Sequence, residues 1–203
     1  MITLYHAPQS RSSRIIWLLE ELGAPYEIEQ VSIFRPMTGL GIPDPANPHP
    51  DKQVPAVVHG DELVAESIAI VLYLAEAFPE AGLGRGVGEA GRGAYLTWVS
   101  WYAAAMEPAM FAAMGNELGT APHKQRGYDK VVGRLEYALA RHPYMMGETF
   151  TAVDLLIASA LNFARRAFPA SEALDAYVAR CTNRPAAIRA AALDDATGLQ
   201  RAA

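Results

Sequence analysis

The sequence contains little cysteine and no long apolar run. Its single cysteine, Cys181, excludes an intramolecular disulfide, CxxC redox chemistry and a cysteine-rich zinc site. The longest uninterrupted apolar run covers eight residues, 68–75, and is far too short to span a membrane. The start of the chain lacks the basic and apolar segments of a secretory signal peptide. We therefore expect a soluble globular protein of the cytoplasm that does not bind membranes.

A strong excess of charge is also missing. The 203 residues include 17 Lys and Arg against 22 Asp and Glu, which gives a net charge of −5. That balance argues against a general nucleic-acid binder, which needs a basic surface. Hydrophobic residues make up 51% of the chain, so disorder is excluded as the main state. The five histidines show no paired metal-ligand spacing, and we expect no metal.

Residues 1–79 alternate between short apolar runs and helical repeats, a pattern typical of an α/β domain. Apolar side chains at i, i+3, i+4 and i+7 predict a first helix that ends before Gly23. A second helix is predicted over residues 67–77, with Ser67 as its N-cap. The first strand–helix–strand unit implies a parallel pair, and a later hairpin completes a mixed four-stranded sheet. The strands are predicted at residues 2–5, 26–31, 54–58 and 63–65.

Strand signals are absent from the second half of the chain. Residues 80–93 contain six glycines and predict a linker. We expect it to separate a first domain, residues 1–79, from an all-helical domain over residues 94–203. The helices of that second domain are predicted at residues 94–114, 124–140, 152–167, 172–180 and 185–192.

One helix start in the second half has a specific sequence signature. Thr151 followed by Asp154 forms a capping-box pattern, and Phe150 with Leu155 forms a hydrophobic staple around it. This pattern predicts the beginning of a buried helix. We interpret it as a folding element and not as a binding site.

Taken together, these segments resemble the cytosolic glutathione transferase superfamily. The resemblance is carried by residues 4–14 (LYHAPQSRSSR), 53–57 (QVPAV), 65–70 (AESIAI) and 150–154, and by Arg184-Pro185. Each motif is weak alone, but all occur in the family's order across nearly the whole chain. The resemblance implies a thioredoxin-like N-terminal domain, an all-helical C-terminal domain and a homodimer. It also implies a detoxifying enzyme that transfers the glutathione thiolate to a small hydrophobic electrophile.

Such an enzyme must stabilise a thiolate, because a free thiol is mostly protonated at neutral pH. Ser10, between the first strand and the first helix, can donate a hydrogen bond to the sulfur, and the helix N-terminus adds a positive field. Ser12, Ser13 and Tyr5 are alternatives for this contact, and Arg11 is a candidate for strengthening the field. Because no cysteine stands here, the chain resembles the serine-type theta and delta classes and not the glutaredoxin-like or omega-like members.

The resemblance places the middle of the glutathione molecule at residues 53–55. Val54 is expected to offer its backbone N–H and C=O to the tripeptide as an added strand. Pro55 is expected to be cis, as in the family. Gln53 is the stronger candidate for the glycyl carboxylate or the peptide. Lys52 departs from the family pattern, in which Gly often stands at this position.

The two ends of the site follow from the same resemblance. Glu66 is expected to bind the ammonium of the γ-glutamyl group, while Ser67 and the helix N-terminus bind its carboxylate. The helical domain is expected to supply a hydrophobic second-substrate pocket, with Tyr102 and Met106 as candidates. Two other functions stay open: a glutathione-dependent isomerase or dehalogenase, and a non-catalytic relative that binds glutathione or another ligand.

Overall fold

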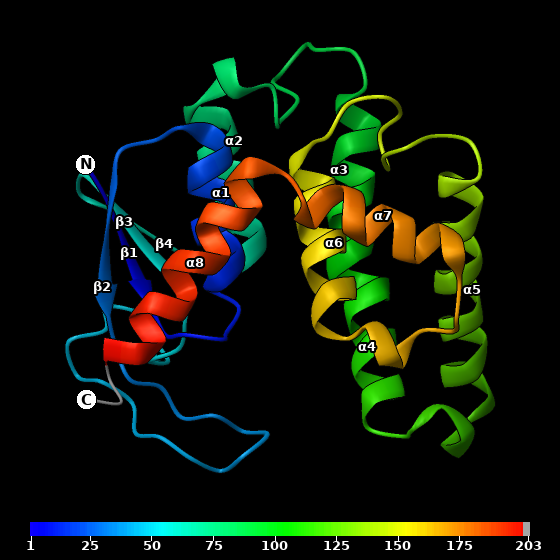
Figure 1. The fold of residues 1–203 in the computed structure, drawn as a ribbon, viewed down its shortest axis with the longest axis horizontal. Coiled ribbons are helices and arrows are strands. Elements are labelled where there is room, and N and C mark those ends of the chain that lie inside the picture. The colour runs from blue at the N-terminus through cyan, green and yellow to red at the C-terminus, as the bar shows by residue number, and fades with distance from the viewer. Residues whose placement is uncertain (201–203) are drawn as a thin grey trace. The chain divides into compact units, whose positions relative to one another are not determined.

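A computed structural model describes residues 1–200 of the chain, and it describes side chains for residues 1–196 (Figure 1). Residues 1–81 form one compact unit together with residues 185–200, and residues 82–184 form a second. This division differs from the predicted all-helical domain over residues 94–203. The reason is that the last helix packs beside the first helix of the N-terminal unit.

The first unit is built on the predicted mixed four-stranded sheet. In the sheet order β2-β1-β3-β4, β1 runs parallel to β2 and antiparallel to β3, and β3 runs antiparallel to β4. Tyr5 pairs with Ala56, and Ala56 pairs with Ala65. This register brings the loop after β1, the start of β3 and the end of β4 to one edge of the sheet. The strands are β1 (Ile2–His6), β2 (Tyr26–Gln30), β3 (Ala56–His59) and β4 (Glu62–Ala65).

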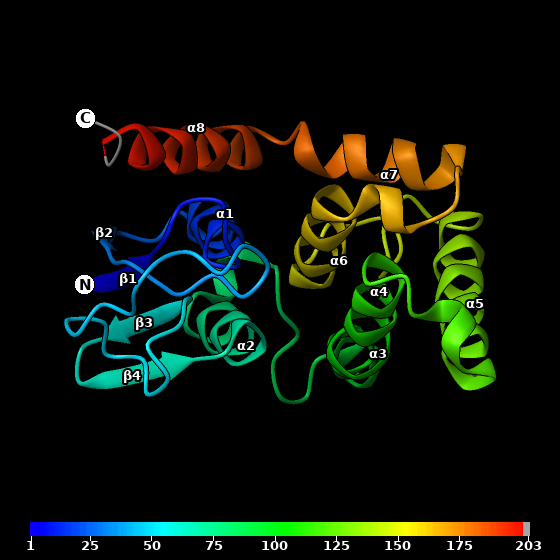
Figure 2. The same cartoon turned by 90° about the horizontal axis from the view of Figure 1, so that it is seen from below.

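Helices α1 (Ser13–Leu22) and α2 (Ser67–Ala77) lie against the sheet, and α8 (Pro185–Gln200) lies beside α1 (Figure 2). Strand β1 is buried at alternate positions, as expected for a strand with one covered face. His6 is therefore on the same buried face as the apolar residues of this strand. Gly23 ends α1 as predicted, at φ 62, with its N–H bonded to a carbonyl of the last turn.

The N-terminus of α2 differs from the prediction. Ser67 is the first residue of the helix, and the N-cap position belongs to Glu66, whose φ is 71. The prediction that Ser67 caps α2 is therefore wrong, because the chain turns one residue earlier than the polar-to-apolar pattern indicates. Glu66 makes no side-chain cap hydrogen bond either. The first turn of α2 thus has N–H groups without a side-chain cap.

The second unit is all-helical. A π-helical turn, η2 (Tyr102–Met106), joins α3 to α4, just before Pro108 in the first turn of α4. Proline has no N–H for a carbonyl four residues back, so a wider turn at this point is expected. The helices are α3 (Arg92–Trp101), α4 (Glu107–Met114), α5 (Pro122–Leu139), α6 (Ala152–Phe163) and α7 (Glu172–Thr182), with short 3-10 turns η3 (Leu118–Thr120) and η4 (Arg165–Ala167); a further turn, η1 (Pro79–Ala81), ends the first unit. Over residues 1–200, none of the helices is both long and apolar enough to cross a membrane.

The predicted capping box is present at the start of α6. Thr151 is the N-cap, and Asp154 accepts hydrogen bonds from the Thr151 N–H at 2.9 Å and from its hydroxyl at 3.1 Å. The same carboxylate accepts the Met145 N–H at 2.8 Å and the Tyr177 hydroxyl at 3.0 Å. Burial raises the pKa of Asp154, and these four hydrogen bonds work against that rise. One carboxylate therefore ties the start of α6 to the preceding loop and to α7.

We expect Asp154→Ala to lower the free energy of unfolding by about 3 kcal/mol or more, because it leaves several buried donors without an acceptor. Asp154→Asn keeps one acceptor oxygen and should cost less. Chemical denaturation followed by circular dichroism measures both changes. As a control, Asp129→Ala removes an exposed carboxylate of α5 and should change stability by no more than about 0.5 kcal/mol. Equal effects at residues 154 and 129 would contradict the role given to Asp154.

Candidate functional site

The candidate site lies along the edge of the sheet where β1 ends and β3 begins. A small apolar cluster of Ala7, Val31 and Val54 is buried there, with Tyr5 and Ile33 packed against it. The cluster joins the loop after β1 to the segment before β3. The Tyr5 side chain packs on this apolar cluster, whereas the serines lie in the loop that follows β1.

The three serines of the loop have different environments. Ser12 is completely buried, and its Oγ lies within hydrogen-bond distance of both the N–H and the C=O of Ala7, each at 3.2 Å. The Ser13 hydroxyl donates to the Asp194 carboxylate at 2.9 Å. Ser10 is partly exposed, and its Oγ accepts the Ser12 N–H at 3.2 Å and lies 2.7 Å from the Ser12 Oγ. Of the three, Ser10 has the hydroxyl best placed to meet a bound molecule, and Arg11 beside it is exposed.

Two residues that the sequence reasoning missed lie behind these serines. His6 is buried on β1, with its Nδ1 2.8 Å from the Ser12 Oγ and its Nε2 3.2 Å from the Asp194 Oδ1. Asp194 comes from α8 and also accepts the backbone N–H of Gln9. The alternation of β1 is a signal that His6 is buried. Nothing in the local sequence indicates which of the acidic residues is its partner.

The Asp194 carboxylate is held in its charged form by these contacts. Burial raises its pKa, but the hydrogen bonds from His6, Ser13 and the Gln9 N–H outweigh that effect, and the pKa falls below its usual range. The carboxylate is therefore ionised at neutral pH. It places a negative charge directly against the buried imidazole.

A loop braced by polar side chains leads into the segment at 53–55. The buried Asn47 donates from its Nδ2 to the Gln53 carbonyl at 2.8 Å, and its Oδ1 accepts the His49 N–H at 3.0 Å. Lys52 has φ 53, a left-handed conformation that favours glycine, which gives a physical reason for the family pattern at this position. The Lys52 ammonium donates to the carbonyls of Pro45 and Asn47. Asn47 is a third residue that sequence reasoning missed, because its partners are defined only by the folded loop.

The Val54–Pro55 peptide bond is cis. Both residues are buried, while the neighbouring Gln53 is exposed. Within residues 1–200, the backbone N–H and C=O of Val54 have no hydrogen-bond partner. Paired N–H and C=O groups of this kind can accept an extended peptide as an additional strand.

Ser67 is the most unusual polar residue of the site. Its side chain is 7% exposed, and its Oγ has no hydrogen-bond partner among the described residues. A buried hydroxyl without a partner is costly in a folded protein and calls for an explanation. Together with the uncapped N–H groups of the 11-residue helix α2, it is well suited to bind a carboxylate. Glu66 beside it is exposed.

The residues predicted for a second-substrate pocket are interior residues in this structure. Tyr102 is 1% exposed and Met106 is 0% exposed, and the Tyr102 hydroxyl donates to Glu107 at 2.7 Å. Neither side chain is open to solvent, so their pocket role stays a prediction.

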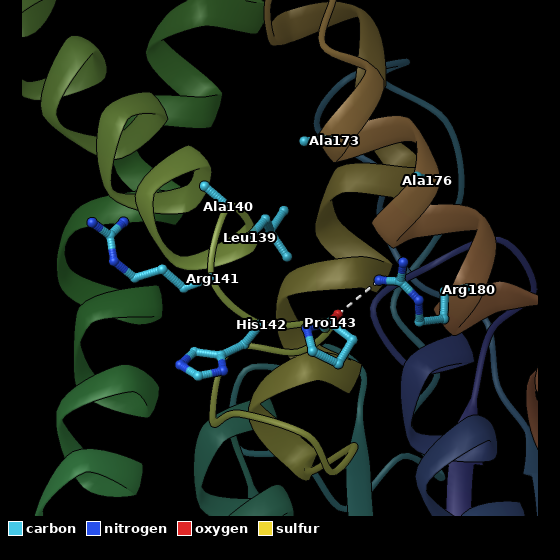
Figure 3. Close-up of a pocket in the computed structure, with 8 residues that line it drawn as sticks. All are labelled: Leu139, Ala140, Arg141, His142, Pro143, Ala173, Ala176 and Arg180. Carbon is cyan, nitrogen blue, oxygen red and sulfur yellow. Dashed lines mark hydrogen bonds between the residues drawn. The ribbon is translucent and has the colours of Figure 1, made fainter.

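A cavity of about 340 Å³ in the helical unit lies elsewhere, beside the end of α5 and the first turns of α7 (Figure 3). Arg180 borders it and donates to the Pro143 carbonyl at 2.8 Å. None of the predicted site residues lines this cavity. Among the described residues, no three His, Cys, Asp or Glu side chains are grouped so that they could hold a metal ion.

Comparison with known proteins agrees with this fold. The glutathione S-transferase N-terminal domain matches residues 1–76, and the C-terminal domain of the same family matches residues 102–185. Glutathione S-transferase 3 of Schizosaccharomyces pombe is 27% identical over 175 residues, which are 85% of this chain and 70% of that protein.

Solved structures share the architecture. A glutathione S-transferase from Actinobacillus pleuropneumoniae has a TM-score of 0.80 at 23% identity, covering 96% of this chain and 93% of that one. A sphingomonad glutathione S-transferase complexed with glutathione has a TM-score of 0.78 at 22% identity, covering 95% of this chain and 98% of that one.

A thioredoxin-like, mixed four-stranded sheet followed by an all-helical segment is the glutathione-transferase type of fold. The two matched domains together span most of the sequence. This chain therefore belongs to the cytosolic glutathione S-transferase superfamily.

We expect Asn47→Ala to destabilise the first unit by about 1–2 kcal/mol, because the Gln53 carbonyl and the His49 N–H each lose a partner. Faster amide hydrogen exchange in the loop before Val54 should accompany this loss. The matched control is Gln53→Ala, which truncates an exposed side chain and should leave stability within about 0.5 kcal/mol of the wild type. Unchanged exchange in the Asn47 variant would show that the loop does not depend on these bonds.

Proposed function

We propose that this protein is a serine-type glutathione transferase in which Ser10 stabilises the glutathione thiolate for attack on a small hydrophobic electrophile. The observation that carries the proposal is the unpartnered, buried Ser67 hydroxyl at the α2 N-terminus, on the same sheet edge as the Ser10 loop. Membership in the superfamily and the glutathione-bound relative support it. A homodimer that acts in cytoplasmic detoxification completes the proposal, on the strength of the family alone.

The candidate binding groups would meet the three residues of glutathione one after another along the edge of the sheet. Ser67 and the first N–H groups of α2 would hold the γ-glutamyl carboxylate, with the exposed Glu66 directed to the ammonium. The free N–H and C=O of Val54 would pair with the cysteinyl backbone. Gln53 would then meet the glycyl end.

In that order the cysteinyl sulfur would lie toward the loop after β1, near Ser10. Each unit by which the thiol pKa is lowered requires about 1.4 kcal/mol of preferential stabilisation of the thiolate. A hydrogen bond from a hydroxyl to an anion, with the N-terminus of α1 nearby, is of that order. Arg11, exposed beside Ser10, would add a positive charge at the entrance. A glutathione-dependent isomerase or dehalogenase would use the same thiolate, and product analysis with a panel of electrophiles separates these activities.

Ser67→Ala should weaken glutathione binding by about tenfold or more, because the carboxylate loses a hydrogen bond in a buried site. The free energy of unfolding of the unliganded protein should stay the same or rise, since the hydroxyl has no partner to lose. Titration calorimetry and chemical denaturation measure the two quantities. The exposed Ser100→Ala on α3 is the matched control and should change neither. Unaltered affinity in the Ser67 variant would remove this residue from the site.

Ser10→Ala should leave glutathione bound but raise the pKa of its thiol by about one to two units, with an equivalent fall of about 10- to 100-fold in kcat/KM at neutral pH. The pH dependence of the thiolate ultraviolet absorbance in the saturated complex measures the thiol pKa. Conjugation of an aromatic halide measures turnover. Undiminished turnover would assign thiolate stabilisation to another group.

A further inference from the structure

A continuous line of polar atoms runs from the partly exposed Ser10 into the interior. The Ser10 Oγ lies 2.7 Å from the Ser12 Oγ, which lies 2.8 Å from the His6 Nδ1. The His6 Nε2 lies 3.2 Å from the Asp194 Oδ1. His6 and Ser12 are 0% exposed, and the Asp194 side chain is 14% exposed. The binding groups described above need only Ser10 from this line, so the three residues behind it require a separate explanation.

The Asp194 carboxylate determines the direction of these hydrogen bonds. An ionised carboxylate only accepts, so the His6 Nε2 must carry a proton. When the Nδ1 carries no proton, it is an acceptor. The Ser12 hydroxyl has two acceptors within reach, the Ala7 carbonyl at 3.2 Å and the His6 Nδ1 at 2.8 Å. When it donates to the nearer Nδ1, Ser10 can donate in turn to the Ser12 Oγ. In this state the Ser10 oxygen has a lone pair available at the open end of the line.

We propose that His6, oriented by Asp194, accepts the thiol proton of glutathione through Ser10 and Ser12. Ser12, His6 and Asp194 together position Ser10 for catalysis. This inference rests on the proposed function. The S–H bond breaks as the proton moves to the Ser10 Oγ. Ser10 passes its own proton to Ser12, and Ser12 passes its proton to the His6 Nδ1. Both hydroxyls are regenerated, and the products are a thiolate and an imidazolium.

The same transfer reverses the direction of every hydrogen bond in the line. The His6 Nδ1 then donates to Ser12, Ser12 donates to Ser10, and Ser10 donates to the thiolate. The hydroxyl that served as the path for the proton thus becomes the donor that stabilises the sulfur anion. After the thiolate has attacked the electrophile and the leaving group has departed as an anion, the imidazolium returns its proton to solvent along the same path.

Charged and polar groups face His6 from several elements. Asp194, on α8, is the acidic side chain placed directly against the imidazole, and it is ionised at neutral pH. Strand β2 presents the uncharged Gln30 opposite His6. The cations on the flanking segments include the exposed Arg11 of the serine loop, the buried Arg14 on α1, and Arg35, whose guanidinium donates to the carbonyls of Pro8 and Gln9.

An ion pair with α1 helps to fix the position of α8, and so the position of Asp194 beside His6. Arg189, one turn before Asp194, donates to the Glu20 carboxylate of α1 at 2.5 Å. Burial raises the pKa of Glu20, but hydrogen bonds from Arg189 and Tyr26 outweigh that effect and lower it. The C-terminal helix therefore supplies a residue of the proton path, although it lies far along the sequence from the serine loop.

The test compares Asp194→Asn with Asp195→Asn, a matched change of charge at the neighbouring exposed residue of α8. We expect the Asp194 variant to raise the thiol pKa of bound glutathione by about one unit and to lower kcat/KM about tenfold below that pKa. The Asp195 variant should match the wild type. Ser12→Ala, which interrupts the line at another point, should give the same shift, and circular dichroism establishes that each variant is folded.

A second measurement follows the proton itself. When glutathione saturates the wild-type protein in weak buffer, fewer protons should appear in solution than thiolates appear by ultraviolet absorbance, because His6 retains part of them. In the Asp194 variant this ratio should approach one proton for each thiolate formed. A ratio of one in the wild type, or an unshifted thiol pKa in both folded variants, overturns the proton path.

The proposed function can fail separately. If calorimetry detects no glutathione binding to the wild type, or if Ser10→Ala leaves the thiol pKa unchanged, the function of Ser10 and the proton path are both overturned. If glutathione binds and Ser10→Ala raises the thiol pKa while Asp194→Asn and Ser12→Ala do not, only the proton path is overturned.

Discussion

The pairing of β1 with β3, and of β3 with β4, is the constraint on which the candidate site depends. The antiparallel pairs Tyr5↔Ala56 and Ala56↔Ala65 fix which chain segments meet at the edge of the sheet. A slip of one residue would turn every side chain to the opposite face. The loop with the serines, the segment before β3 and the start of α2 are therefore neighbours because the sheet makes them so. Apolar packing around Val54 then closes the gap between two of these segments.

The buried polar side chains that hold the fold together have hydrogen-bond partners. His6, Asn47 and Asp154 each have hydrogen-bond partners, as expected when the cost of an unpaired buried group is about 1–3 kcal/mol. Ser67 does not, and it lies at a helix N-terminus, where a carboxylate is favoured by both the N–H groups and the helix dipole. The contrast distinguishes polar residues that hold the fold together from one that is suited to a ligand.

Local patterns predicted the elements well because the interactions behind them are local. The end of α1 at Gly23 depends on one left-handed residue, and the capping box of α6 depends on groups three positions apart. The same reasoning failed where a single position decides the outcome, as at the start of α2, where Glu66 and not Ser67 is the N-cap. It also named Tyr102 and Met106 as pocket candidates, and both are interior residues in the structure, since a helical stripe looks the same whether it lines a pocket or fills a core.

The sequence by itself determined the order of strands and helices, the mixed sheet and the superfamily, because these follow from residues within a few positions of one another and from motifs that keep their order along the chain. Only the tertiary structure decided that the last helix packs with the first unit, that Ser12 is buried while Ser10 is partly exposed, and that His6 is paired with Asp194. Those facts depend on side chains that are far apart in sequence, such as Ser13 and Asp194, 181 residues apart, and their meeting is set by packing that no local pattern encodes.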